Sequence, residues 1–93
     1  MSQSIRTEYI IINRLGLHAR AAAKLASTAG KFGCVIKTGR DPEKLVDAKS
    51  VMSLMLLAAT QGTTLHFTFD GSDAERAQRE IEQLIANRFD EEQ

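Results

Sequence analysis

The sequence has very little cysteine, proline or tryptophan. Its 93 residues include one cysteine, one proline and no tryptophan. The single thiol, Cys34, cannot form an internal disulfide, and no pair of Cys and His residues has the spacing of a zinc site. We therefore expect no metal and no other cofactor, and a reducing compartment suits such a chain.

Neither sign of charge is in excess. Twelve basic side chains balance twelve acidic ones, whereas a nucleic-acid-binding domain normally carries a basic face. No apolar run approaches the roughly 20 residues of a transmembrane helix. The first residues also lack the basic-then-apolar order of a signal peptide. These absences predict a cytoplasmic protein that binds neither nucleic acid nor membrane, and nothing in the sequence requires more than a monomer.

A chain of this length forms one domain, residues 1–93, with a modest core. It buries only about 60–65% of the surface that it exposes when unfolded, which leaves no room for a deep substrate pocket. Residues 90–93 are polar and are predicted to form a frayed tail.

Hydrophobic periodicity predicts an α+β fold in the order βαββαβα. We expect strands at residues 5–12, 33–38, 44–48 and 63–69, and helices at residues 18–30 and 51–59 and after a capping box of Ser72 and Glu75. This order predicts a four-stranded antiparallel sheet with the three helices on one face. Ferredoxin-like folds share most of it, so topology alone does not name a function.

Alternating and helical patterns also predict the core. Leu65, Phe67 and Phe69 share one face of the last strand, and His66 lies on the other. The final helix has one apolar stripe, made by Ala74, Ala77, Ile81, Leu84 and Ile85.

His18 stands where the first helix should begin, directly after a turn that contains Gly16. The first N–H groups of a helix lack partners and its macrodipole is positive there, so this position attracts anions such as a phosphoryl group. The same helix end disfavours an imidazolium and keeps a nucleophilic nitrogen available. Arg20 can stabilise a phosphate. The plainer alternative is that both are ordinary solvated residues.

The second helix, capped by Ser50, is apolar around most of its circumference. A helix on one face of a sheet buries one stripe, here Leu54, Leu57 and Ala58. Val51, Met52 and Met55 are then left as an adaptable apolar patch, which points to protein docking if neighbouring loops do not cover it. His66 and Cys34 are weaker candidates, because no base or orienting partner accompanies them.

Three segments resemble the HPr family, the histidine phosphocarriers of bacterial phosphotransferase systems. Residues 13–24, NRLGLHARAAAK, resemble its active-site segment. Residues 47–55, DAKSVMSLM, are similar to its regulatory-serine segment, and residues 60–63 resemble its approach to the last strand. With the order of elements, the resemblance covers nearly the whole chain.

The resemblance implies an open-faced β-sandwich and a phosphoryl carrier rather than a complete enzyme. An enzyme I that uses phosphoenolpyruvate would phosphorylate Nδ1 of His18, Arg20 would stabilise the phosphate, and an enzyme IIA-type protein would accept it. Ser50 matches a serine that a dedicated kinase modifies in some members. The implied docking face is made by Leu17, Ala21, Lys24, Lys49, Val51, Met52 and Met55.

Two features qualify the resemblance. Ala21 replaces a proline that many members carry, which leaves the helix intact but its start less rigid. Residues 44–47 look closer to the nitrogen-related branch than to the sugar-transport branch. A docking module that uses His18 without phosphorylation is the alternative function, and an RNA-binding domain is disfavoured by the neutral charge and by burial of Phe67 and Phe69.

Overall fold

The elements follow the predicted order. The computed structural model describes residues 3–93, with strands β1 (Gln3–Ile10), β2 (Val35–Gly39), β3 (Val46–Asp47) and β4 (Thr64–Gly71). The helices are α1 (Ala19–Gly30), α2 (Val51–Leu56) and α3 (Ala74–Ala86), followed by a short 3₁₀ turn, η1 (Arg88–Asp90).

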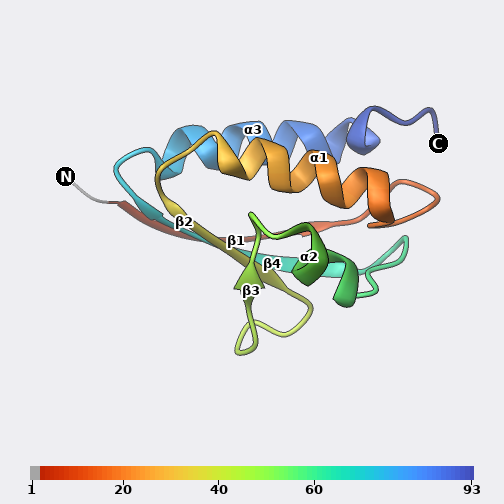
Figure 1. Ribbon diagram of the computed structural model, residues 1–93, viewed down its shortest axis with the longest axis horizontal. Helices are drawn as coiled ribbons and strands as arrows, with labels where there is room; N and C mark the ends of the chain where they lie inside the picture. Colours follow the sequence, from red (N-terminus) through yellow and green to blue (C-terminus); the bar gives the residue numbers. More distant parts are fainter. Residues whose placement is uncertain (1–2) are drawn as a thin grey trace.

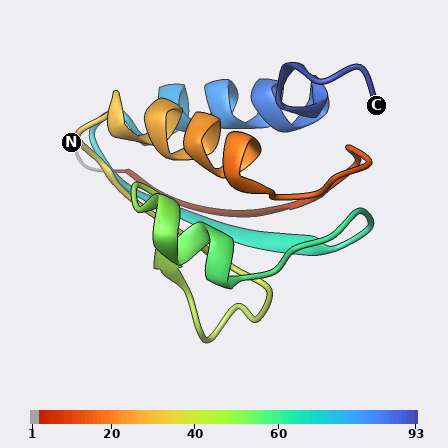
Figure 2. The ribbon, with the colours of Figure 1, turned by 45° about the vertical axis from the view of Figure 1, so that its right-hand side comes forward.

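The strands form one antiparallel sheet in the order β1-β4-β2-β3. β4 lies inside the sheet, where Phe67 pairs with Thr7 on one side and with Thr38 on the other. Figure 1 shows α1 and α3 side by side over one face of the sheet, and Figure 2 shows α2 below α1 on the side of β2 and β3. This arrangement confirms the α+β open-faced β-sandwich.

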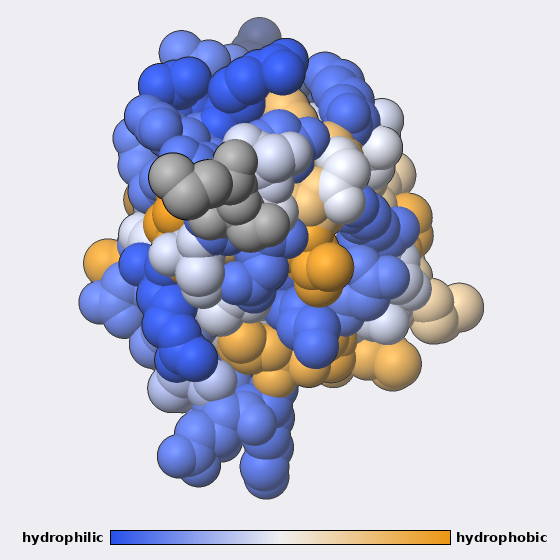
Figure 3. Space-filling view, turned by 90° about the vertical axis from the view of Figure 1, so that its left-hand side faces the viewer, coloured by the Kyte–Doolittle hydropathy of each residue, from blue (hydrophilic) through white to orange (hydrophobic). Residues whose placement is uncertain are grey.

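The core lies between the sheet and the helices. Leu65, Phe67 and Phe69 are buried as predicted, and α1 contributes mainly alanines to the same core cluster. The stripe of α3 is buried at all predicted positions except Leu84, which is only partly covered. At the end of the molecule seen in Figure 3, the helical layer at the top presents mainly hydrophilic residues.

Several element boundaries differ from the prediction. α2 ends before Ala58, which has a φ of 51° and is exposed, so its predicted place in the buried stripe is wrong. The chain leaves the helix there because the carbonyl of Ala59 accepts a hydrogen bond from Leu17 N–H at 2.8 Å. β3 shrinks to two residues because the preceding loop turns on Asp41, whose carboxylate accepts from Glu43 N–H.

The predicted capping box at the start of α3 is wrong. Asp73 is the N-cap residue, and its two carboxylate oxygens accept hydrogen bonds from the backbone of Gly33 and Cys34, each at 2.9 Å. The N–H of Glu75 donates instead to the Gln3 side chain on β1. The start of α3 is therefore fixed by two other segments of the chain.

The tail, predicted to be frayed, is docked on α1 in the structure. Arg88, Phe89 and Asp90 all have φ between 53° and 64°, a left-handed backbone that costs roughly 1–2 kcal/mol per non-glycine residue. Full burial of the Phe89 ring, worth about 1.5–3 kcal/mol, offsets part of this cost. The turn directs the last residues back toward the start of α1. No helix in residues 3–93 is long and apolar enough to cross a membrane.

Asp73 gives the fold a testable pH dependence. Its pKa is lowered, first by the hydrogen bond from Gly33 N–H. A lowered pKa adds stability above the unfolded-state value, and this stability is lost as the pH falls through the folded-state value. We expect Asp73→Asn to unfold at a lower temperature at neutral pH, because an amide offers one acceptor oxygen instead of two, and we expect the difference to shrink in acid. Thermal unfolding monitored by circular dichroism measures it.

The matched control is Asp70→Asn, at an exposed position on β4. This variant should follow the wild-type melting curve at every pH. A deficit of Asp73→Asn that stays constant from neutral to strongly acidic pH would contradict the assignment.

Candidate functional site

The short loop between β1 and α1 is fixed by hydrogen bonds and by close backbone packing. Asn13 is fully buried, and its side-chain amide donates to the carbonyl of Gly16 at 2.8 Å. Gly16 has a φ of 66° and lies against the backbone of Ala59 and Thr60, where a Cβ atom would clash. Leu17 N–H then donates to the Ala59 carbonyl. These contacts fix the residue at which α1 begins.

That residue is His18, as the sequence predicts. His18 is the N-cap of α1, in an extended conformation, and its carbonyl accepts the first helical hydrogen bond from Ala22 N–H at 2.8 Å. Its side chain makes no capping hydrogen bond, and the first turn contains no acidic residue. The amides at this helix end are therefore available to an external anion, next to a ring that is 29% exposed.

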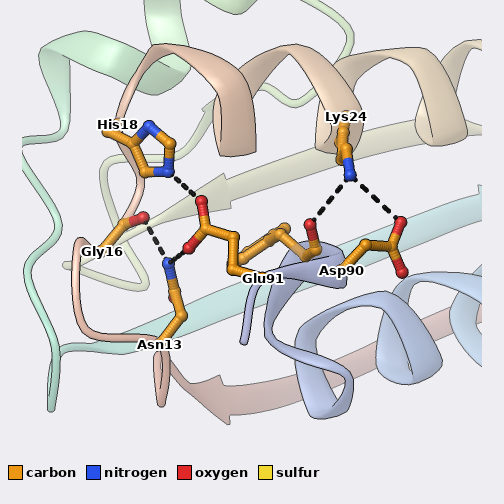
Figure 4. A network of polar contacts seen from close by, with 7 residues as sticks. Asn13, Gly16, His18, Lys24, Asp90 and Glu91 are labelled. Atoms are coloured by element: carbon orange, nitrogen blue, oxygen red, sulfur yellow. Dashed lines mark hydrogen bonds and ion pairs between the residues drawn. The ribbon is translucent and has the colours of Figure 1, made fainter. Parts of the chain in front are cut away.

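A carboxylate from the tail contacts the ring. Glu91 Oε2 accepts a hydrogen bond from His18 Nε2, and Glu91 Oε1 accepts one from the Asn13 amide at 2.8 Å (Figure 4). Because a carboxylate only accepts, Nε2 carries the hydrogen in this contact. In Figure 4 the other ring nitrogen, Nδ1, points away from Glu91.

Lys24 joins the tail to α1. Its Nζ donates to the Phe89 carbonyl at 3.1 Å and to the Asp90 carboxylate at 3.3 Å (Figure 4). The pKa of Asp90 is lowered, first by the hydrogen bond from Asn87 and then by Lys24. Burial raises the pKa of Glu91, but hydrogen bonds from Asn13 and His18, with the charge of Arg20, outweigh it and lower the pKa. Both tail carboxylates are therefore stabilised as anions beside the helix start.

The predicted docking residues divide into exposed and buried ones. Val51, Met52 and Met55 are exposed, Met52 by 68%. Leu17 and Ala21 are only 5% and 0% exposed, so their expected place on the docking face is corrected: both point into the core beneath the site. Lys24 and Lys49 are half-buried, and each Nζ donates to a backbone carbonyl, that of Phe89 and that of Phe32.

The structure adds residues that the sequence did not indicate. Leu56 is 78% exposed and extends the group of Val51, Met52 and Met55, which together we name the α2 patch. Leu15, in the loop before His18, is also exposed. Ser50 caps α2, and its Oγ accepts from Ser53 N–H at 3.2 Å, as the N-cap prediction requires. The sequence also did not indicate Glu91 and Asn13 as residues of the site, because no local pattern marks a contact between them.

The other candidates do not form a second reactive centre. Cys34 is buried, and burial together with Asp73 raises the pKa of its thiol to about 11, which makes it a poor nucleophile. His66 lies on the open face of the sheet, with Nδ1 3.4 Å from the Glu8 carboxylate. Among residues 3–93, no cluster of three or more His, Cys, Asp or Glu could hold a metal ion.

Gly16 offers a test of how the loop is built. In Gly16→Ala the new Cβ would lie 2.5 Å from the Ala59 oxygen at a φ of 66°, and we expect the free energy of unfolding to fall by about 1–3 kcal/mol. Gly30→Ala is the matched control, because nothing lies within 4 Å and the residue ends α1. It should be neutral or stabilising by up to about 1 kcal/mol. Equal stability of the two variants in urea unfolding would contradict the packing described.

Comparison with known proteins agrees with this geometry. The family model described as "PTS HPr component phosphorylation site" matches residues 5–87. Phosphocarrier protein HPr of Pseudomonas aeruginosa is 51% identical over 84 residues, covering 90% of this chain and 93% of that protein. HPr of Cupriavidus necator is 47% identical over 87 residues, covering 94% and 97%.

A solved structure is similar throughout. The crystal structure of HPr from Thermoanaerobacter tengcongensis superposes with a TM-score of 0.89 at 37% identity, covering 96% of this chain and 99% of that one. Sequence and structure therefore place this chain in the HPr family of phosphocarrier proteins of the phosphotransferase system.

Proposed function

We propose that His18 is the phosphoryl acceptor of this carrier. Its Nδ1 would take the group from an enzyme I-type donor charged by phosphoenolpyruvate and pass it to an enzyme IIA-type protein. One observation carries the proposal: the His18 ring lies at the uncapped start of α1, with Nε2 held by Glu91 and Nδ1 directed away from it. Nδ1 is therefore the ring nitrogen with a lone pair to offer.

The surroundings of His18 suit a group that carries about −1.5 to −2 charge. The free amides and the positive end of the α1 macrodipole favour an anion at this position. Arg20 is exposed on the first turn of α1, where its guanidinium can contact phosphate oxygens as they arrive or leave. The site is open, so the alignment of donor, histidine and acceptor would come from the partner proteins.

The α2 patch is the proposed docking surface. It lies close to His18, because the segment that follows α2 is hydrogen-bonded to Leu17 through Ala59. Methionine side chains adapt to differently shaped partners, which suits a carrier that must bind a donor and an acceptor in turn. Rapid exchange between partners favours an interface at the small end of the usual range.

Ser50 is the proposed site of regulation by a kinase. It is half-exposed and directly precedes Val51 and Met52 of the α2 patch. A phosphate on Ser50 would place about −1.5 to −2 charge beside this apolar surface and oppose docking by its desolvation cost. Assignment to the nitrogen-related branch stays a prediction from residues 44–47.

The function is tested by phosphorylation in vitro. With enzyme I and phosphoenolpyruvate, we expect the intact protein to gain the mass of one phosphate in an acid-labile, alkali-stable form. His18→Ala should gain none, while His66→Ala, which removes the other histidine, should behave like wild type. Mass spectrometry measures the gain. A wild-type protein that binds enzyme I and stays unmodified would favour the alternative, a docking module that uses His18 without phosphorylation.

The docking surface is tested by adding charge to it. Met52→Glu should weaken binding to enzyme I by about tenfold or more, because a carboxylate would have to be desolvated at an apolar contact. Val35→Glu is the matched control, since Val35 is an exposed apolar residue on β2, outside the α2 patch. Isothermal titration calorimetry gives both affinities. Equal weakening by the two substitutions would show that docking does not use the α2 patch.

A further inference from the structure

The tail, residues 90–93, forms several hydrogen bonds around the His18 site. Glu91 bridges His18 and Asn13 through its two carboxylate oxygens. Beyond it, the Gln93 carbonyl and side chain accept hydrogen bonds from the backbone and guanidinium of Arg14, at 2.9 and 2.8 Å. Before it, the Lys24 Nζ contacts Phe89 and Asp90. The Glu91 carboxylate is thus held from both sides.

The turn that delivers Glu91 is strained. Three consecutive non-glycine residues, Arg88 to Asp90, have positive φ. Such strain persists only where surrounding contacts hold it, and it is concentrated at functional sites. Here it is held by the buried Phe89 ring and by the Asn87 amide, which donates to the Asp90 carboxylate at 2.7 Å. The strained turn brings a carboxylate, itself only 12% exposed, onto one nitrogen of His18.

We propose that Glu91 is a positioning residue for phosphoryl transfer: it keeps the proton on Nε2 of His18, orients the ring with Nδ1 outward, and stabilises the positive ring that forms when Nδ1 is phosphorylated. The proposal rests on the proposed function of His18. A carboxylate that orients a catalytic histidine and stabilises its cation plays the same part in serine proteases.

The transfer step shows why the proton matters. The lone pair of Nδ1 forms a bond to phosphorus, the bond from phosphorus to the donor breaks, and its electron pair stays with the donor. Because Nε2 keeps its proton, the ring becomes a cation, and the Glu91 carboxylate faces it. When the phosphoryl group passes to the acceptor, the bond from phosphorus to Nδ1 breaks and its electron pair stays with the ring. A ring that is still protonated on Nε2 then leaves as a neutral imidazole, which is a better leaving group than an imidazolate.

Asn13 completes the arrangement. It is fully buried, and its amide nitrogen donates both to Glu91 Oε1 and to the Gly16 carbonyl. The second oxygen of Glu91 is therefore tied to the loop that fixes the start of α1. The carboxylate cannot rotate away from Nε2 without breaking this hydrogen bond, so the loop and the tail orient the ring together.

The first experiment needs no phosphorylation. In ¹H–¹⁵N spectra of the unmodified protein, the Nε2 proton of His18 should give a downfield signal protected from exchange with water. Glu91→Ala should lose this signal, and Glu92→Ala, its exposed neighbour, should keep it. A wild-type protein with no protected Nε2 proton would overturn the proposal, whatever the outcome for the proposed function.

The second experiment measures transfer under single-turnover conditions. Glu91→Gln, which keeps the size of the side chain and removes its charge, should slow phosphorylation of His18 by about tenfold or more, the scale known for hydrogen-bond partners of metal-binding histidines. Glu92→Gln should match wild type, and Glu91→Asp should recover part of the rate. An unchanged rate in Glu91→Gln would refute the positioning role. A faster rate would also refute it and would make the tail an inhibitory cover. If wild type itself is never phosphorylated, the proposed function fails and the proton signal alone tests the contact.

Discussion

The hydrogen bond from Leu17 N–H to the Ala59 carbonyl is the contact on which the site depends. It joins the loop before α1 to the segment after α2, two regions far apart in the sequence. It requires Gly16 to approach the Ala59 backbone without a Cβ atom. Once it forms, α1 begins at His18, and α2 is placed beside it. This one hydrogen bond therefore sets both where the free start of α1 lies and where the apolar α2 patch lies beside it.

Local patterns explain which parts of the fold could be predicted. Alternation marked Leu65, Phe67 and Phe69 correctly, because a strand covered on one face has a period of two whatever packs on it. The start of α1 was also local, since a glycine turn precedes an alanine-rich run. The lower burial of Val51, Met52 and Met55 followed from the limited width of the stripe that a helix on a sheet can bury.

What the sequence did not predict depends on contacts between distant segments. Ser72 and Glu75 have the spacing of a capping box, but Gln3 on β1 offers a competing acceptor, and Asp73 binds the approach to β2. Ala58 was assigned to a stripe that ends one residue earlier, because the chain turns to reach Leu17. Residues 90–93 have the composition of a frayed end. The side-chain partners of Glu91 and Gln93 lie 73 to 79 residues earlier in the chain, beyond the reach of any periodic pattern.

The proposed phosphoryl site at His18 raises an electrostatic objection, because a carboxylate beside it should repel the incoming group. In the proposed mechanism the phosphoryl group would be on Nδ1 of His18, whereas Glu91 contacts Nε2 through its proton. Without that proton, Glu91 would face a second acceptor and lose its hydrogen bond, so the docked tail and the protonated Nε2 require each other. The free amides of α1 and the guanidinium of Arg20 add positive charge near the ring. A negatively charged tail is therefore compatible with a phosphate site as long as its carboxylate accepts the proton of Nε2 in a hydrogen bond.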